Sequence, residues 1–156
     1  MSSKKFAYIF TLLSIVGLVL SACASQPPAV NTPETETGSG ESSIIGFDDL
    51  VAALQAAGAQ VEPAGEVEQV FLSASGQIIK LNGVDVQVFE YATPEAAEAE
   101  AGTISPDGTS TNTTMITWID APHFYRWGKL IVLYVGSDEG VISLLEGILG
   151  PQFAGQ

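Results

Sequence analysis

QIIKLNGVDVQVFEY, residues 77–91, contains a strong signal for a β-hairpin. The pair Asn82-Gly83 favours a two-residue β-hairpin turn, and it separates two runs rich in β-branched residues, 77–81 and 84–91. The sequence therefore predicts two antiparallel strands joined by a tight turn. Side chains alternate along the second strand, so one face carries Val84, Val86, Val88 and finally Glu90, and the other carries Asp85, Gln87, Phe89 and Tyr91.

A helix and one further strand are predicted before this hairpin. Apolar residues recur at helical spacing between Phe47 and Leu54, two aspartates suit the positive N-terminal end of a helix, and Gly58 is placed to cap its C-terminus. We expect a helix over 48–57. The run EQVFLS, residues 68–73, is expected to form a strand that a short Ala-Ser-Gly turn joins to the hairpin.

A second helix and a second group of strands are predicted after the hairpin. Thr93-Pro94-Glu95 is a helix start, with Thr as the cap and Pro at the first helical position, and Gly102 ends that helix. The polar run 103–113 is expected to form a loop or a wide turn. The remaining expected elements are strands over 114–120, 123–127 and 130–136, and a last helix that Ser137 or Asp138 caps and Gly150-Pro151 stops.

The order of these elements predicts an α+β fold in residues 44–156, a single domain of ordinary size. About six strands form one antiparallel sheet, and the helices are expected to pack on one of its faces. Both halves read as strands, a hairpin, a strand and a helix, which suggests a duplicated βββα unit behind the leading helix.

The N-terminal 23 residues have a different character. Lys4 and Lys5 precede an uncharged, mostly apolar run over 6–20, and small residues follow it. Fifteen residues of helix span about 22 Å, which is short of the roughly 30 Å of a bilayer core, so a signal peptide over 1–22 is favoured over an uncleaved anchor helix. Leu20-Ser21-Ala22-Cys23 at its end resembles the lipobox of bacterial lipoproteins.

The lipoprotein resemblance implies lipidation of Cys23, with diacylglycerol in thioether linkage, cleavage before the cysteine and often a further acyl chain such as palmitate on the new amino group. Two or three acyl chains hold a protein to a membrane stably, whereas one chain does so only marginally. The expected location is the extracytoplasmic side of a cell-envelope membrane, and the outer membrane where a cell has two. Cys23 is the only cysteine, so residues 44–156 contain no disulfide and no cysteine-based metal site.

A spacer and a strongly acidic domain are predicted beyond the cysteine. Residues 24–43 are rich in Pro, Ser, Thr and Glu and contain one large apolar residue, so we expect this spacer to be disordered. From Cys23 onward the chain has three basic and eighteen acidic residues, which gives a formal charge of −15. That charge disfavours nucleic acid as a partner, because nucleic-acid binding depends on Lys and Arg contacts to phosphate.

The densest group of aromatic and polar residues lies between Trp118 and Trp127. One interpretation is a ligand-binding platform, with aromatic faces for a sugar or a cation and with hydrogen-bond donors beside them. The alternative is that the aromatic residues pack the sheet and the single histidine is satisfied at an edge. The candidate ligand-binding residues are Trp118, His123, Tyr125, Arg126 and Trp127.

No catalytic motif, phosphate-binding loop or zinc-ligand spacing is found, and the sequence assigns no cofactor and no catalytic or metal-binding residue. The expected function is therefore a membrane-anchored protein with a small binding or interaction domain. Two alternatives stay open: a cell-surface hydrolase that uses His123 with Asp120 or another nearby carboxylate, and a structural accessory subunit of an envelope complex. The first requires a cleft in which His123 meets an acidic residue.

Overall fold

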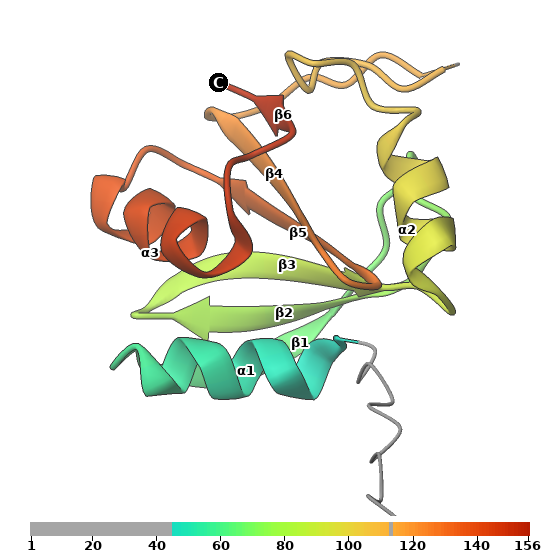
Figure 1. Ribbon diagram of the computed structural model, residues 1–156. Helices are drawn as coiled ribbons and strands as arrows, with labels where there is room; N and C mark the ends of the chain where they lie inside the picture. Colours follow the sequence, from blue (N-terminus) through green and yellow to red (C-terminus); the bar gives the residue numbers. More distant parts are fainter. Residues whose placement is uncertain (1–44, 113) are drawn as a thin grey trace, which may run out of the picture. The chain divides into compact units, whose positions relative to one another are not determined.

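The computed structural model describes residues 45–112 and 114–156. The predicted signal peptide over 1–22, the predicted lipidation site Cys23 and the predicted spacer lie outside the described residues. The described chain forms one antiparallel sheet and three helices, so the predicted α+β class and six-stranded sheet are confirmed. In sheet order the strands are β1 (Val61–Val67), β2 (Gly76–Leu81), β3 (Val84–Glu90), β5 (Leu130–Val135), β4 (Pro122–Trp127) and β6 (Ala154–Gly155) (Figure 1).

The predicted hairpin is β2 and β3, and it has the expected turn. Leu81 pairs with Val84, which leaves Asn82 and Gly83 as the two turn residues. Their φ angles of 51° and 92° place both in the left-handed region, as a type I′ turn requires. β3 also pairs with β5, so the hairpin extends into the middle of the sheet.

The three helices begin and end close to the predicted residues: α1 spans Phe47–Ala56, α2 spans Pro94–Ala101 and α3 spans Glu139–Leu149. The Thr93 hydroxyl accepts a hydrogen bond from the Ala96 N–H at 3.2 Å, and Pro94 occupies the start of α2. Asp138 caps α3 through its carboxylate, which accepts from the N–H of Gly140 at 2.8 Å. The capping residues Thr93 and Asp138 therefore allow the N-termini of α2 and α3 to be predicted from the sequence.

The helices do not all pack on one face of the sheet, and that expectation is wrong. α1 and α3 cover one face with a core that includes Val86 and Val88, whereas α2 covers the opposite face with Phe89. Figure 1 shows α2 and α3 on opposite sides of the β4–β5 hairpin. The physical reason is that the central strands are apolar on both faces: every residue from Leu130 to Leu133 is fully buried, and a face with such side chains must be covered.

The expected strand over 68–73 is also wrong, because this run is a loop. The strand that precedes β2 is β1, which contains Pro63 and Gly65 and has a register shift between them. β1 is the outer strand of the sheet and is largely exposed, and an edge position tolerates a proline and a bulge. A run with such residues does not look like a strand in the sequence.

The expected strand over 114–120 is reduced to a single bridge between Ser110 and Met115. The first half of the domain therefore follows the βββα order, whereas the second has two strands before its helix, so the predicted duplication is only partial. The expected strands over 123–127 and 130–136 are confirmed as β4 and β5. No helix of the described residues is long and apolar enough to cross a membrane.

Candidate functional site

The five residues predicted to bind a ligand do not form one exposed platform. Tyr125 is fully buried in the core beneath α1 and α3, and Trp127 packs against the same core. Trp118 packs on the opposite face, edge-on to Phe71 and Phe124 with ring centroids 5.6 and 5.8 Å away. Tyr125 and Trp127 lie on alternate positions of β4 and so share one face, and the buried sheet separates them from Trp118.

Arg126 and His123, the two polar members of the predicted group, are also separated. Arg126 is exposed on β4, and it takes part in neither of the ion pairs formed among the described residues. His123 is buried, with only 5% of its surface exposed. Of the five predicted residues, only Trp118 lines the hollow at the point where the α2–β4 connection reaches β4.

The ring of His123, on β4, connects this strand to the residues that follow β5 and α3. Its ring nitrogens lie 2.8 Å from the side-chain oxygen of Gln152 and 3.0 Å from the backbone oxygen of Gly136. The ring stacks on Tyr134, with an angle of 19° between the two planes. Asp120, its expected acidic partner, instead accepts a hydrogen bond from the N–H of Ala121 at 2.8 Å. Among the described residues no carboxylate hydrogen-bonds to His123, so the expected pair of His123 with an acidic side chain is not formed.

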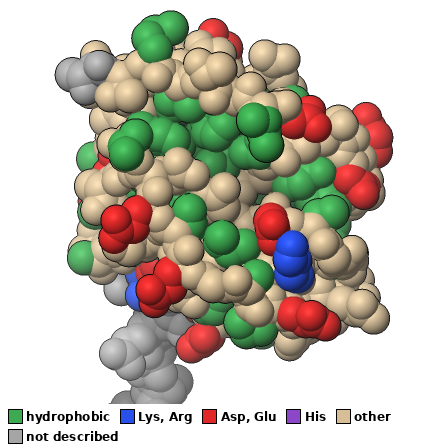
Figure 2. Space-filling model, turned by 180° about the vertical axis from the view of Figure 1, so that it is seen from behind, with side chains coloured by type: hydrophobic (Ala, Val, Ile, Leu, Met, Phe, Trp, Pro, Cys, Tyr) green, Lys and Arg blue, Asp and Glu red, His purple; other side chains and the backbone are tan. Residues whose placement is uncertain are grey.

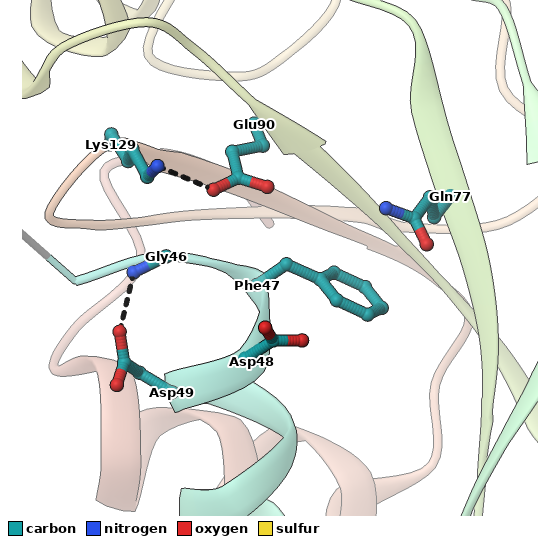
Figure 3. Close-up of a pocket in the computed structure, with 7 residues that line it drawn as sticks. All are labelled: Gly46, Phe47, Asp48, Asp49, Gln77, Glu90 and Lys129. Carbon is teal, nitrogen blue, oxygen red and sulfur yellow. Dashed lines mark hydrogen bonds and ion pairs between the residues drawn. The ribbon is translucent and has the colours of Figure 1, made fainter.

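A polar recess of about 300 Å³ lies at the N-terminus of α1, beside the β4–β5 turn (Figure 3). Lys129 reaches across it to Glu90, with a nitrogen–oxygen distance of 2.7 Å, and the Asp49 carboxylate accepts from the N–H of Gly46 at 2.9 Å. The backbone N–H of Lys129 also donates to the oxygen of Ile45 at 3.2 Å. These polar groups are paired with one another, and they fix the start of the described domain against the β4–β5 turn.

A larger hollow, of about 500 Å³, lies where the long connection from α2 enters β4. Part of this connection forms a narrow hairpin, in which the N–H of Ile116 donates to the oxygen of Thr109 at 2.8 Å. The indole N–H of Trp118 then donates to the oxygen of Gly108 at 2.7 Å, which joins the two sides of the hairpin at its base. The hollow is lined by Thr109, Ile116, Thr117, Trp118, Ile119, Asp120, Ala121, Pro122 and Gln156.

Asp107 organises the loop before this hairpin. Its carboxylate accepts hydrogen bonds from the Ser105 hydroxyl at 2.6 Å and from the Thr109 N–H and hydroxyl at 3.1 and 2.9 Å. The Ser105 hydroxyl, followed by the two Thr109 donors, lowers the pKa of this exposed carboxyl below its usual range. Asp107 thus serves the local structure of the loop. No group of three or more His, Cys, Asp or Glu side chains placed to hold a metal ion occurs in the described parts of the chain.

The largest exposed apolar side chains lie at this end of the molecule. Ile119 is 99% exposed, Val70 94% and Met115 80%. Val70 belongs to the β1–β2 connection, and it lines a smaller hollow together with Thr111 and residues on both sides of position 113. We call Val70, Met115, Trp118 and Ile119 the apolar loop surface. Figure 2 shows hydrophobic side chains gathered over the upper half of the molecule, at the level where the α2–β4 connection lies in Figure 1.

Acidic side chains border the apolar loop surface. Asp120 lines the hollow beside Ile119, and Glu68 and Glu100 line smaller hollows beside Val70. None of the three basic residues of the described chain lines any of these hollows. The surface therefore combines exposed apolar groups with negative charge.

Most of this surface was missed in the sequence. Trp118 was predicted as a ligand-binding residue, but Ile119 and Met115 were assigned to a strand that does not form, and Val70 to another. The available signal was the position of large apolar residues among threonines and acidic residues, outside any well-supported strand. Such a signal is weak, because single exposed apolar residues are common in proteins.

No family model matches this chain, and no match is found among curated proteins or solved structures.

Proposed function

We propose that this protein is a membrane-anchored extracytoplasmic lipoprotein whose domain binds a partner through the apolar loop surface. The anchoring is supported by Leu20-Ser21-Ala22-Cys23 at the end of a short apolar run, and by the Pro-, Ser- and Thr-rich segment that follows. The lipid on Cys23 would hold the protein to the membrane, and the spacer over 24–43 would keep the domain away from the lipid surface.

The observation that carries the binding role is the position of the apolar loop surface relative to the start of the described chain. Ile45 is bonded to the turn that connects β4 to β5, whereas the segment containing Ile119 leads into Pro122 at the other end of β4. Six residues of β-strand separate those two ends by about 17 Å. A tethered domain would then present the Ile119 part of its apolar loop surface away from the point at which the spacer joins it.

The chemistry of the site favours binding over catalysis. A hydrolase needs an acid, base or nucleophile within reach of its substrate, whereas His123 is buried and occupied by Gln152 and Gly136. The hollow beside Ile119 offers apolar contacts, the uncharged polar groups of two threonines and a glutamine, and one carboxylate, Asp120. A role as accessory subunit of an envelope complex would use the same surface in the same way, and it is a special case of this proposal.

Two measurements test the two halves of the proposal separately. Metabolic labelling with an alkyne analogue of palmitate should tag the full chain and should fail for Cys23→Ala, which should also leave the membrane fraction. Ile119→Asp should keep the label and the native fold but lose partner binding. A Cys23→Ala variant that stays labelled in the membrane would contradict the anchoring, and normal co-purification of partners by Ile119→Asp would contradict the binding site.

A further inference from the structure

The backbone beside the larger hollow has unused hydrogen-bonding groups. Residues 117–120 run alongside it without regular secondary structure, and their N–H and C=O groups make no backbone hydrogen bond within the described residues. On their N-terminal side Ile116 bonds to Thr109, and on their C-terminal side Ala121 bonds to Gly136. This short irregular stretch bends at residues 119 and 120 and is held at both ends, and residues 117 and 118 leave main-chain groups for a ligand.

An extended peptide is a ligand that satisfies such a stretch. Its main chain can pair with free N–H and C=O groups in the manner of an added β-strand, while alternate side chains enter neighbouring hollows. Here one such hollow, of about 500 Å³, has Trp118 and Ile119 in its lining. Trp118 and Ile119 give apolar contacts to a bulky side chain of the peptide, and the polar part of the lining, Thr109, Thr117 and Gln156, faces the rest of the hollow.

The charge around the surface selects among possible occupants. The described domain has fifteen acidic and three basic residues, and Glu68, Glu100 and Asp120 lie next to the exposed apolar groups. A second copy of this chain would bring the same negative charge to the contact, and an anionic membrane surface would also be repelled. A segment that carries Lys or Arg is attracted.

We propose that the apolar loop surface binds an extended segment of a partner protein in which bulky apolar residues alternate with Lys or Arg. The apolar residues contact Trp118 and Ile119, the basic residues face Glu68 and Asp120, and the segment's main chain forms hydrogen bonds with residues 117 and 118. This inference rests on the proposed function and specifies the chemistry of the partner.

A peptide titration tests this proposal. The protein is the full chain in phosphatidylcholine nanodiscs, and empty nanodiscs serve as the blank. The probes are fluorescently labelled nine-residue peptides, and binding is followed by fluorescence anisotropy. The first peptide alternates Lys with Val around a central Phe. In the second, Glu replaces Lys; in the third, Ser replaces the apolar residues; and in the fourth, Ser replaces Lys.

The first peptide should bind saturably, and the second and third should bind at least about tenfold more weakly, since like charge repels and an apolar anchor is missing. Ile119→Asp should abolish binding of the first peptide. Glu68→Gln combined with Asp120→Asn should weaken it and reduce its salt dependence. Gln55→Glu, a change on an exposed position of α1 away from the surface, should leave the affinity unchanged.

Three results would overturn the inference. The first is no saturable binding of the Lys peptide up to about 1 mM, a concentration at which even weak complexes are detected. The other two are equal affinities for the Lys and Glu peptides, and an unchanged affinity for the Lys peptide in Ile119→Asp. Equal binding of the Ser-for-Lys and Lys peptides, lost on Ile119→Asp, would overturn the requirement for basic residues and leave the proposed binding surface intact. Membrane labelling of Cys23 is measured independently of all four peptides.

Discussion

Replacement of His123 distinguishes a structural role for this residue from the catalytic role considered from the sequence. Its ring bonds to Gln152 and to the backbone oxygen of Gly136 and stacks on Tyr134, all within a site that is 95% buried. His123→Phe keeps an aromatic ring of similar shape but removes both hydrogen bonds. His123→Ala removes the hydrogen bonds and the ring.

The expected loss of stability follows from these contacts. Each hydrogen bond contributes about 1 kcal/mol net, and an acceptor that stays buried without a partner costs about 1–3 kcal/mol. Gln152 is only half-buried and can turn towards water, so most of the cost comes from the oxygen of Gly136. We expect His123→Phe to lower the free energy of unfolding by about 2 kcal/mol, and His123→Ala by about 3–4 kcal/mol, because it also loses the buried ring.

Urea denaturation of the full chain, followed by tryptophan fluorescence, measures both values. Trp118 and Trp127 report on opposite faces of the sheet, so coincident transitions also test whether the domain unfolds as one unit. The denaturant dependence should stay unchanged while the midpoint falls. If both variants unfolded within about 0.5 kcal/mol of the native protein, a change expected at ordinary surface sites, the structural role of His123 would be refuted.

The structure also fixes the sign of the effect of three substitutions and of one change in pH. Gly128→Ala should lower the free energy of unfolding by about 1–2 kcal/mol, because φ is +57° there and an added Cβ would lie 2.6 Å from the Cβ of Ile45. Gly147→Ala should raise the free energy of unfolding by about 0.5–1 kcal/mol, because Gly147 lies inside α3 with open space around it. Thermal melts of the two variants measure both changes. Tyr125→Phe should be neutral or stabilising in chemical denaturation, since the buried Tyr125 hydroxyl has no hydrogen-bond partner among the described residues. A destabilisation above about 1 kcal/mol, the net value of a typical hydrogen bond, would show that this hydroxyl has a partner. Burial, and then the charge of Glu146, raises the pKa of Tyr125 to about 12, so the unfolded chain ionises first and stability should fall as pH rises from about 10 to about 12. Tyr125→Phe should reduce that fall in alkaline denaturation curves. A part of the fall should remain, because burial also raises the pKa of Tyr91.

Local signals made much of the fold predictable. The hairpin around Asn82-Gly83 and the helix start at Thr93-Pro94 depend on residues adjacent in sequence, and both formed as predicted. β1 could not be found in this way, because Pro63 and Gly65 are acceptable only at a sheet edge, and which strand lies at the edge is decided by the whole fold.

The candidate site depended even more on tertiary structure. Trp118 and Tyr125 are close in sequence, yet they pack on opposite faces because the central sheet is covered on both sides. The exposure of Ile119 follows from an irregular segment that replaces an expected strand. Periodicity identifies which residues are apolar, but it does not determine which apolar residues the fold leaves uncovered.

Site-specific photocrosslinking in living cells can show whether Ile119 contacts a partner protein. A benzoylphenylalanine residue would replace Ile119 in the full chain, and the same residue at Gln55 on α1 would be the control, since both positions are exposed. If the apolar loop surface binds a partner, a discrete crosslinked protein should form in the membrane fraction from position 119 and none from position 55. Equal crosslinking from both positions, or no protein adduct from position 119, would contradict this binding role.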